Sequence, residues 1–253
     1  MTLVQAAGRS PRRWGKIALV IVAVILAIPI FSPIIFRTFL FQPFYIPAGS
    51  MMPTLLVGDS LFVSKYAYGY SRYSLPFSPR LISGRIFGSV PERGDVAVFR
   101  IPRDDSVDYI KRIVGLPGDT VQMQRGVLVI NGVPVVRERL SDFEGDEPCG
   151  AGDDNRTRRW RETLSNGASY ETLDCVDNGF YDSTNVYTVP AGHVFVLGDN
   201  RDNSTDSRVR TAVGYIPLEN LVGRAGLIYF SRKPAAGGEP SVMRSERIGK
   251  FVH

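Results

Sequence analysis

An unbroken run of uncharged, mostly apolar residues near the N-terminus limits what this chain can fold into. The run covers residues 17–36 and reads IALVIVAVILAIPIFSPIIF. Twenty residues of helix rise about 30 Å, which matches the thickness of the hydrocarbon core of a bilayer. Pro29 and Pro33 lie in its second half, and membrane helices tolerate proline. The run therefore predicts a transmembrane helix over 17–36, so the rest of the chain folds outside the bilayer.

The charges around this run predict its orientation. No acidic residue occurs in the first 37 positions, and the basic ones are Arg9, Arg12, Arg13, Lys16 and Arg37. Because basic residues are retained on the cytoplasmic side, we expect residues 1–16 in the cytoplasm and the chain after Arg37 on the exported side. The alternative is a cleaved signal peptide. We favour a retained single-pass anchor, because the run is longer than an h-region and no small-x-small site with a polar flank follows it.

The remaining residues are electrically balanced. The 253-residue chain has 30 Lys and Arg against 25 Asp and Glu, a net charge of +5 that belongs entirely to the N-terminal segment. This balance disfavours a nucleic-acid surface on the main domain. With two histidines and two cysteines, a structural zinc site is not expected, and we predict no metal site.

Short β-branched segments bounded by Gly, Pro, Asp or Asn follow the anchor, which predicts a mainly β body. These segments are residues 60–65, 95–101, 108–114, 127–136, 193–198 and 225–230. Asn131-Gly132 lies between two apolar runs and is typical of a β-hairpin. No long stretch outside the membrane run has the periodicity of an amphipathic helix.

A polar, charged stretch interrupts this body. We expect a main β-domain over 37–136 and 189–232, an inserted β-rich subdomain over 137–188, and a C-terminal tail over 233–253. The insertion contains both cysteines of the chain, Cys149 and Cys175. An even pair in an exported domain predicts a disulfide, and two unpaired thiols are the alternative.

Lysine is scarce in the exported body. Of the five lysines, only Lys65 and Lys111 lie there, and Lys111 lies in the sequence DYIKRIVGLPGD, on the predicted strand 108–114. Burial would lower the pKa of such a lysine from about 10.4 to about 7–8, so that the amine can take a hydroxyl proton at neutral pH. A solvated, outward-facing lysine is the alternative. Periodicity does not choose between them, because the neighbours on both faces are apolar.

Two further segments carry hydroxyl and charged groups. The sequence GSMMP places Ser50 between a flexible glycine and a rigid proline, where its Oγ and main-chain N–H can reach one substrate atom. The sequence GDNRDNSTDSR, residues 198–208, directly follows an apolar strand. There Ser204 can hydrogen-bond a lysine amine, and Asp206 can form an ion pair with Arg208. Taken singly, the two segments also fit an ordinary turn and a solvated loop.

A Ser-His-Asp triad would need His193, because His253 is the last residue. The alternation of HVFVLG instead predicts that His193 is a half-buried strand residue.

These segments together resemble bacterial type I signal peptidase, the membrane-anchored leader peptidases that use a serine and a lysine. The resemblance rests on IPAGSMMPTLLVGD, RGDVAVFRIP, DYIKRIVGLPGD and GDNRDNSTDSR, in that order behind an N-terminal anchor. It implies a mainly β, membrane-anchored fold and cleavage of signal peptides from translocated preproteins, without metal or cofactor. It also implies the inner membrane as location, with the catalytic domain on the periplasmic side. The partners implied are preproteins that bear signal peptides and the lipid bilayer, with the secretion translocon as a further candidate and no nucleic acid.

The resemblance also implies roles for individual residues. Ser50 would be the nucleophile and Lys111 the general base. Ser204 would orient the lysine amine, and Asp206 with Arg208 would hold its loop. Shallow pockets for the small residues of a signal peptide would be lined by Phe44, Ile46, Met51, Leu55, Val98 and Ile110. Many members have a serine two positions before the nucleophile, whose hydroxyl donates to the oxyanion, but this chain has Ala48.

Two other interpretations remain. One is a specialised relative, such as an organellar inner-membrane peptidase or a conjugation-pilin peptidase; the complete GDNRDNSTDSR segment and the large insertion argue against it. The other is a membrane-anchored β-domain that only binds exported chains. The presence of both Ser50 and Lys111 argues against that alternative.

Overall fold

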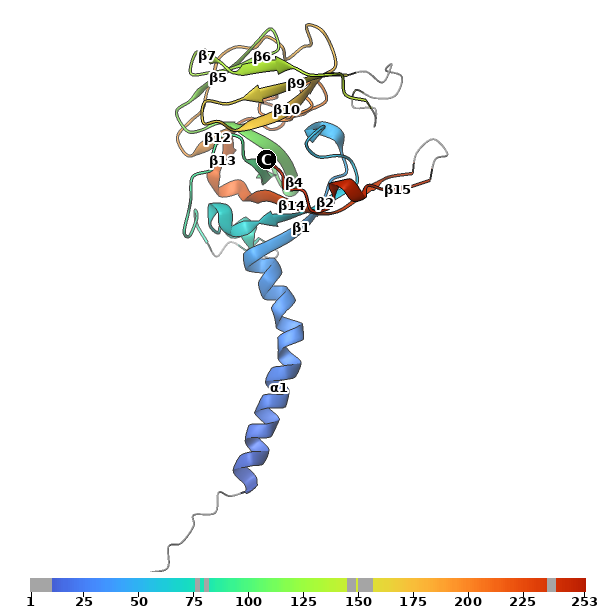
Figure 1. The fold of residues 1–253 in the computed structure, drawn as a ribbon. Helices are drawn as coiled ribbons and strands as arrows, with labels where there is room; N and C mark the ends of the chain where they lie inside the picture. The colour runs from blue at the N-terminus through green and yellow to red at the C-terminus, as the bar shows by residue number, and fades with distance from the viewer. Residues whose placement is uncertain (1–10, 76–77, 80–81, 145–148, 150–156, 236–239) are drawn as a thin grey trace, which may run out of the picture.

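The computed structural model describes residues 11–75, 78–79, 82–144, 149, 157–235 and 240–253. Helix α1 (Pro11–Ile35) extends away from the β body, and a π-helix (Phe36–Leu40) joins it to strand β1 (Phe41–Tyr45) (Figure 1). The segment Lys16–Leu40 is long and apolar enough to cross a membrane, and its most apolar stretch is not buried within the protein. Helix α1 begins at Pro11, before the predicted span 17–36, and ends at Ile35, so that Phe36 already belongs to the π-helix.

One large antiparallel sheet forms the centre of the body. Its order is β1-β2-β14-β3-β4-β12-β13, and β15 pairs with β14. The bounds are β2 (Asp59–Ser64), β3 (Val96–Ile101), β4 (Asp104–Gly115), β12 (His193–Leu197), β13 (Ile216–Pro217), β14 (Leu221–Lys233) and β15 (Val242–Met243). Short 3₁₀ turns cover Gly49–Met51, Lys65–Tyr68, Arg72–Ser74, Leu218–Asn220 and Ser245–Arg247. The mainly β body is thus confirmed.

Two smaller sheets lie at the end of the body opposite α1 (Figure 1). The four-stranded sheet has the order β11-β5-β6-β7 and contains β5 (Thr120–Gln124), β6 (Val127–Ile130), β7 (Val133–Pro134) and β11 (Tyr187–Thr188). Asn131 and Gly132 have φ values of 52° and 77°, the left-handed conformation that a two-residue hairpin requires. The predicted hairpin therefore joins β6 to β7.

The other small sheet is formed from residues of the polar stretch. It has the order β10-β9-β8, with bounds β8 (Val136–Arg139), β9 (Arg158–Thr163) and β10 (Ser169–Asp174). Cys149 and Cys175 form a disulfide, as the sequence predicts. An apolar cluster that includes Leu128, Leu164 and Phe195 packs both small sheets against β12. The exact division into main domain and insertion stays a prediction.

The C-terminal residues pack against the large sheet. Arg247 makes a forked contact with Asp59, in which Nη2 lies 2.6 Å from Oδ2 and Nε 3.0 Å from Oδ1. Asp59 is completely buried and also accepts hydrogen bonds from Ser231 Oγ, at 2.6 Å, and from the main chain of Leu56, at 2.8 Å. Because Arg247 Nη2 also donates to the Thr54 carbonyl, at 2.9 Å, this contact ties the C-terminus to the segment that follows Ser50.

Replacing Arg247 should therefore destabilise the body. We expect Arg247→Ala to lower the free energy of unfolding by about 3 kcal/mol, because it removes the main counter-charge of a buried carboxylate. The loss is limited by the bonds that Asp59 keeps. Thermal unfolding followed by circular dichroism in detergent measures it, with the exposed Arg210→Ala as control. Equal melting temperatures for the two variants would contradict the prediction.

Candidate active site

Ser50 lies on a short turn whose neighbours are anchored in the core. After β1 the chain is extended through Ala48, with φ −135° and ψ 151°, and then enters the 3₁₀ turn Gly49–Met51. Met51 and Leu55 are completely buried, and the Leu55 N–H donates to the Met51 carbonyl at 2.9 Å. Apolar residues on the downstream side therefore hold the turn, while Ser50 itself stays half-buried.

Lys111 reaches Ser50 from the centre of the large sheet. It lies on β4 opposite Ala97 of β3 and is 4% exposed. Its Nζ is hydrogen-bonded to Ser50 Oγ at 2.6 Å and donates to the Ile110 carbonyl at 3.0 Å. Burial lowers the pKa of Lys111 from 10.5 to about 8, against the opposing effect of Asp206 and Asp199. About half of these amines are therefore neutral near pH 8.

Lys65, the other lysine that the sequence analysis considered, has a similar environment but a different hydrogen-bond partner. Lys65 is 3% exposed, and burial and the nearby Arg37 lower its pKa to about 8. Its Nζ donates to the Ser74 carbonyl at 2.6 Å rather than to a hydroxyl group. A lowered pKa thus does not distinguish the two lysines, but the contact with Ser50 does.

Arg112, the next residue along β4, anchors the opposite face of the strand. Its Nε and Nη2 donate to the two carboxylate oxygens of Asp199, at 2.8 and 2.7 Å, and both side chains are 1% exposed. Thr54 Oγ1 donates to Asp199 Oδ2 at 2.5 Å, and the Arg112 guanidinium stacks 4.0 Å above the centre of the Tyr170 ring. This pair joins β4 to the segment after Ser50 and to the loop that contains Asp199.

The loop 198–208 contains a second buried ion pair. Arg208 Nε and Nη2 each lie 2.8 Å from an oxygen of Asp206, which also accepts the Gly198 N–H at 3.0 Å. Burial favours the neutral acid, but the Arg208 guanidinium lowers the pKa of Asp206 below its usual value. The ion pair predicted from sequence is therefore present.

The structure places Ser204 near Ser50 without bonding it to Lys111. A Cβ added to Gly198 would lie 2.1 Å from Ser204 Oγ and 2.6 Å from the Ser50 carbonyl oxygen, so Gly198 lies between them. In the described part of the chain, Ser204 Oγ makes no hydrogen bond to Lys111. A glycine is needed here because any larger residue would clash with Ser204 and the Ser50 main chain.

The residues predicted to line the substrate pockets lie in one apolar cluster. Ile46, Met51, Leu55 and Val98 are buried in it, and Phe44 and Ile110 pack against it. The same cluster includes Leu61, Val63, Val222 and Ile228, which the sequence analysis did not single out. Their periodicity on β2 and β14 identifies them as core residues, but no local signal shows which core they join.

His193 takes no part in this arrangement. It pairs with Pro217 across β12 and β13, and its Nδ1 is hydrogen-bonded to the Ala191 carbonyl at 2.9 Å. No group of three His, Cys, Asp or Glu side chains in the described residues is placed to hold a metal ion.

The sequence analysis missed Arg112, Asp199 and Thr54. Adjacent Lys and Arg residues in an apolar strand were the available signal. Neighbouring residues of a strand point to opposite faces. When both faces of the strand are covered, Lys111 and Arg112 therefore each enter a different buried face.

The chain matches known proteins over most of its length. The family model described as "Signal peptidase, peptidase S26" matches residues 12–230. The signal peptidase I of Rickettsia typhi is 42% identical over 208 residues, covering 79% of this chain and 76% of the relative. That of Rickettsia conorii is 40% identical over 230 residues, covering 88% of this chain and 80% of the relative.

Among solved structures, a signal peptidase I from Enterococcus faecalis is 29% identical, with a TM-score of 0.31, and covers 54% of this chain and 97% of its own. The family match extends over the apolar helix, the Ser50 turn, β4 and the loop 198–208. The chain therefore belongs to the signal peptidase family, peptidase S26, and is a peptidase.

Proposed function

We propose that this chain is a membrane-bound serine endopeptidase that removes signal peptides from translocated preproteins, with Ser50 as nucleophile and Lys111 as general base. The observation that carries the proposal is the 2.6 Å contact between Lys111 Nζ and Ser50 Oγ, made by a buried amine whose pKa is lowered to about 8. Membership of the signal peptidase family supports the substrate class.

In this mechanism the neutral Lys111 amine accepts the Ser50 hydroxyl proton as Oγ attacks the scissile carbonyl. The resulting ammonium group donates that proton to the leaving amine, which leaves an acyl-enzyme on Ser50. Lys111 then takes a proton from water, which hydrolyses the ester and restores the serine. The main-chain N–H of Ser50 is the proposed donor to the oxyanion.

The loop 198–208 supports the base. Asp206 and Arg208 hold the loop through their buried ion pair, and Asp206 also provides a negative charge that keeps the Lys111 pKa from falling further. Ser204 is proposed to orient the Lys111 amine once substrate is bound. Two of the three hydrogen-bonding positions of the Lys111 nitrogen are engaged, one with Ser50 Oγ and one with the Ile110 carbonyl.

The apolar cluster beside Ser50 is proposed to receive the small side chains of the signal peptide, through Phe44, Ile46, Met51, Leu55, Val98 and Ile110. We place the body on the exported side of the inner membrane and residues 1–16 in the cytoplasm. Preproteins that emerge from the translocon then meet the enzyme at the bilayer. The short stretch of chain between the end of α1 and Ser50 supports a site close to the bilayer surface.

The dyad makes a prediction about pH. Ser50→Ala and Lys111→Ala should abolish cleavage of a purified preprotein, and Lys111→Arg should also fail because guanidinium does not deprotonate. Since the active base is the neutral amine, kcat/KM should rise with pH, be half-maximal at about pH 8 and reach a plateau at higher pH. His193→Ala should retain turnover. Near-normal cleavage by Lys111→Arg would show that Lys111 is not the base.

Ala48 leaves room for an additional oxyanion donor. Its backbone is extended and its side chain exposed, so Ala48→Ser should fold normally. We expect the hydroxyl to raise kcat by up to about tenfold with little change in KM, because the new hydrogen bond strengthens in the transition state. Single-turnover cleavage by the wild type, Ala48→Ser and the Ala48→Gly control measures this. Equal rates for wild type and Ala48→Ser would mean that the oxyanion is already fully stabilised.

The topology can be tested by protease access. Protease added to spheroplasts should digest the body, whereas in inverted vesicles it should reach only about the first fifteen residues. Mass analysis of the protected fragments locates the cut sites. A body that survives in intact spheroplasts and is degraded in inverted vesicles would reverse the proposed orientation.

A further inference from the structure

We infer that Asn200 positions the Ser50 turn and that the Cys149–Cys175 disulfide holds the Asn200 side chain in place, so that the inserted strands control the geometry of the nucleophile. This inference rests on the proposed role of Ser50. It makes Asn200 a positioning residue, acting through the main chain of the turn.

Asn200 donates hydrogen bonds to two successive carbonyl groups of the turn. Its main-chain N–H donates to the Ser50 carbonyl at 3.2 Å, and its side-chain Nδ2 donates to the Gly49 carbonyl at 3.3 Å. Asn200 is completely buried. The Gly49 carbonyl and the Ser50 N–H belong to the same planar peptide group. A bond that sets the direction of this carbonyl therefore also sets the direction of the proposed oxyanion donor.

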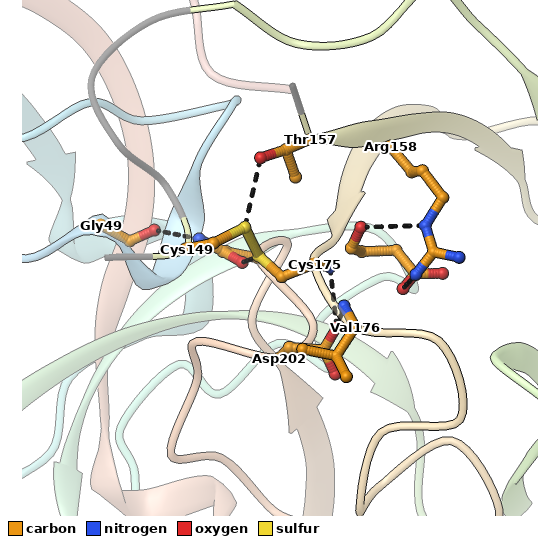
Figure 2. Close-up of a disulfide and its surroundings, with 9 residues drawn as sticks. Gly49, Cys149, Thr157, Arg158, Cys175, Val176 and Asp202 are labelled. Carbon is orange, nitrogen blue, oxygen red and sulfur yellow. Dashed lines mark hydrogen bonds and ion pairs between the residues drawn. A yellow bond between two sulfur atoms is a disulfide. The ribbon is translucent and has the colours of Figure 1, made fainter. Parts of the chain in front are cut away.

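The disulfide packs against the other end of the same amide. Asn200 Oδ1 lies 3.6 Å from Cys175 Sγ, and Cys149 Sγ lies 3.2 Å from Thr157 Oγ1. Figure 2 shows Gly49 to the left of the disulfide and Thr157 above it. Without the sulfur atoms, a cavity would open beside the Asn200 amide. The side chain would then have space to turn away from Gly49.

Other contacts hold the main chain of this loop independently of the disulfide. The Leu173 N–H donates to the Asp199 carbonyl, and the Arg201 N–H donates to the Leu173 carbonyl, both at 2.9 Å. Arg201 also forms a buried ion pair with Glu162 of β9, at 2.5 Å. Loss of the disulfide should therefore free the Asn200 side chain while leaving the loop folded.

The first test compares variants of the full chain in detergent, with one preprotein substrate under single-turnover conditions. Cys149→Ala/Cys175→Ala should lower the cleavage rate constant by about tenfold, the effect expected from weakening one positioning hydrogen bond. KM and the pH midpoint should be unchanged, because neither the apolar cluster nor Lys111 is altered. Asn200→Ala should lower the rate by at least the same factor.

The decisive measurement combines the cysteine substitutions with Asn200→Ala in one variant. If the disulfide acts through Asn200, removing it in the Asn200→Ala background should change the rate by less than about twofold. Asn220→Ala is the matched control, because it also removes a buried amide's bond to a main-chain carbonyl, that of Arg100 at 2.9 Å. It should leave the rate unchanged.

If the double alanine variant fails to fold, folded wild type is treated with a water-soluble phosphine. The phosphine gives up two electrons and takes the oxygen of water, and the two sulfurs become thiols. The inference is overturned by equal rates with and without the disulfide, by equal rates for Asn200→Ala and Asn220→Ala, or by a full additional loss in the combined variant. Absence of cleavage by wild type, or cleavage by Ser50→Ala, would instead refute the proposed function.

Discussion

The ion pair between Arg112 and Asp199 is the contact on which the arrangement around Ser50 depends. Removing two charges from water costs several kcal/mol per ion, and only well-aligned hydrogen bonds offset that cost. Here both oxygens of Asp199 are engaged by the guanidinium, and Thr54 adds a further donor. Strand β4, the segment after Ser50 and the loop after β12 must therefore meet in one geometry, since any displacement leaves a buried charge uncompensated.

The position of Lys111 follows from that contact. Successive residues of a strand point to opposite faces, so fixing Arg112 on one face of β4 directs Lys111 to the other. There the lysine is surrounded by protein, which lowers its pKa to about 8 and brings it into contact with Ser50. The ion pair between Asp206 and Arg208 lies close enough to affect the Lys111 pKa in both directions. The low pKa and the contact therefore both result from burial of one strand segment.

The two ends of the molecule also bear on the Ser50 turn. On the membrane side, α1 leads through the π-helix into β1, and the chain then reaches Ser50 within a few residues (Figure 1). On the far side, β10 and its disulfide contact the loop that holds the turn. The C-terminal Arg247 meets the same region through Asp59 and the Thr54 carbonyl. A polar stretch and a C-terminal segment with no obvious chemistry in the sequence thus both support the site.

The sequence alone determined the features that depend on local chemistry. The apolar run predicted the membrane helix, alternation predicted a β body, Asn131-Gly132 predicted a hairpin, and the cysteine pair predicted a disulfide. It left open whether Lys111 is buried or solvated, because both faces of its strand looked alike, and it gave no partner for Arg112 and no role for Asn200. Those answers needed the tertiary structure. Ser50 and Lys111 are 61 positions apart and Arg112 and Asp199 are 87 apart, so what each charged group meets is decided by how distant segments pack.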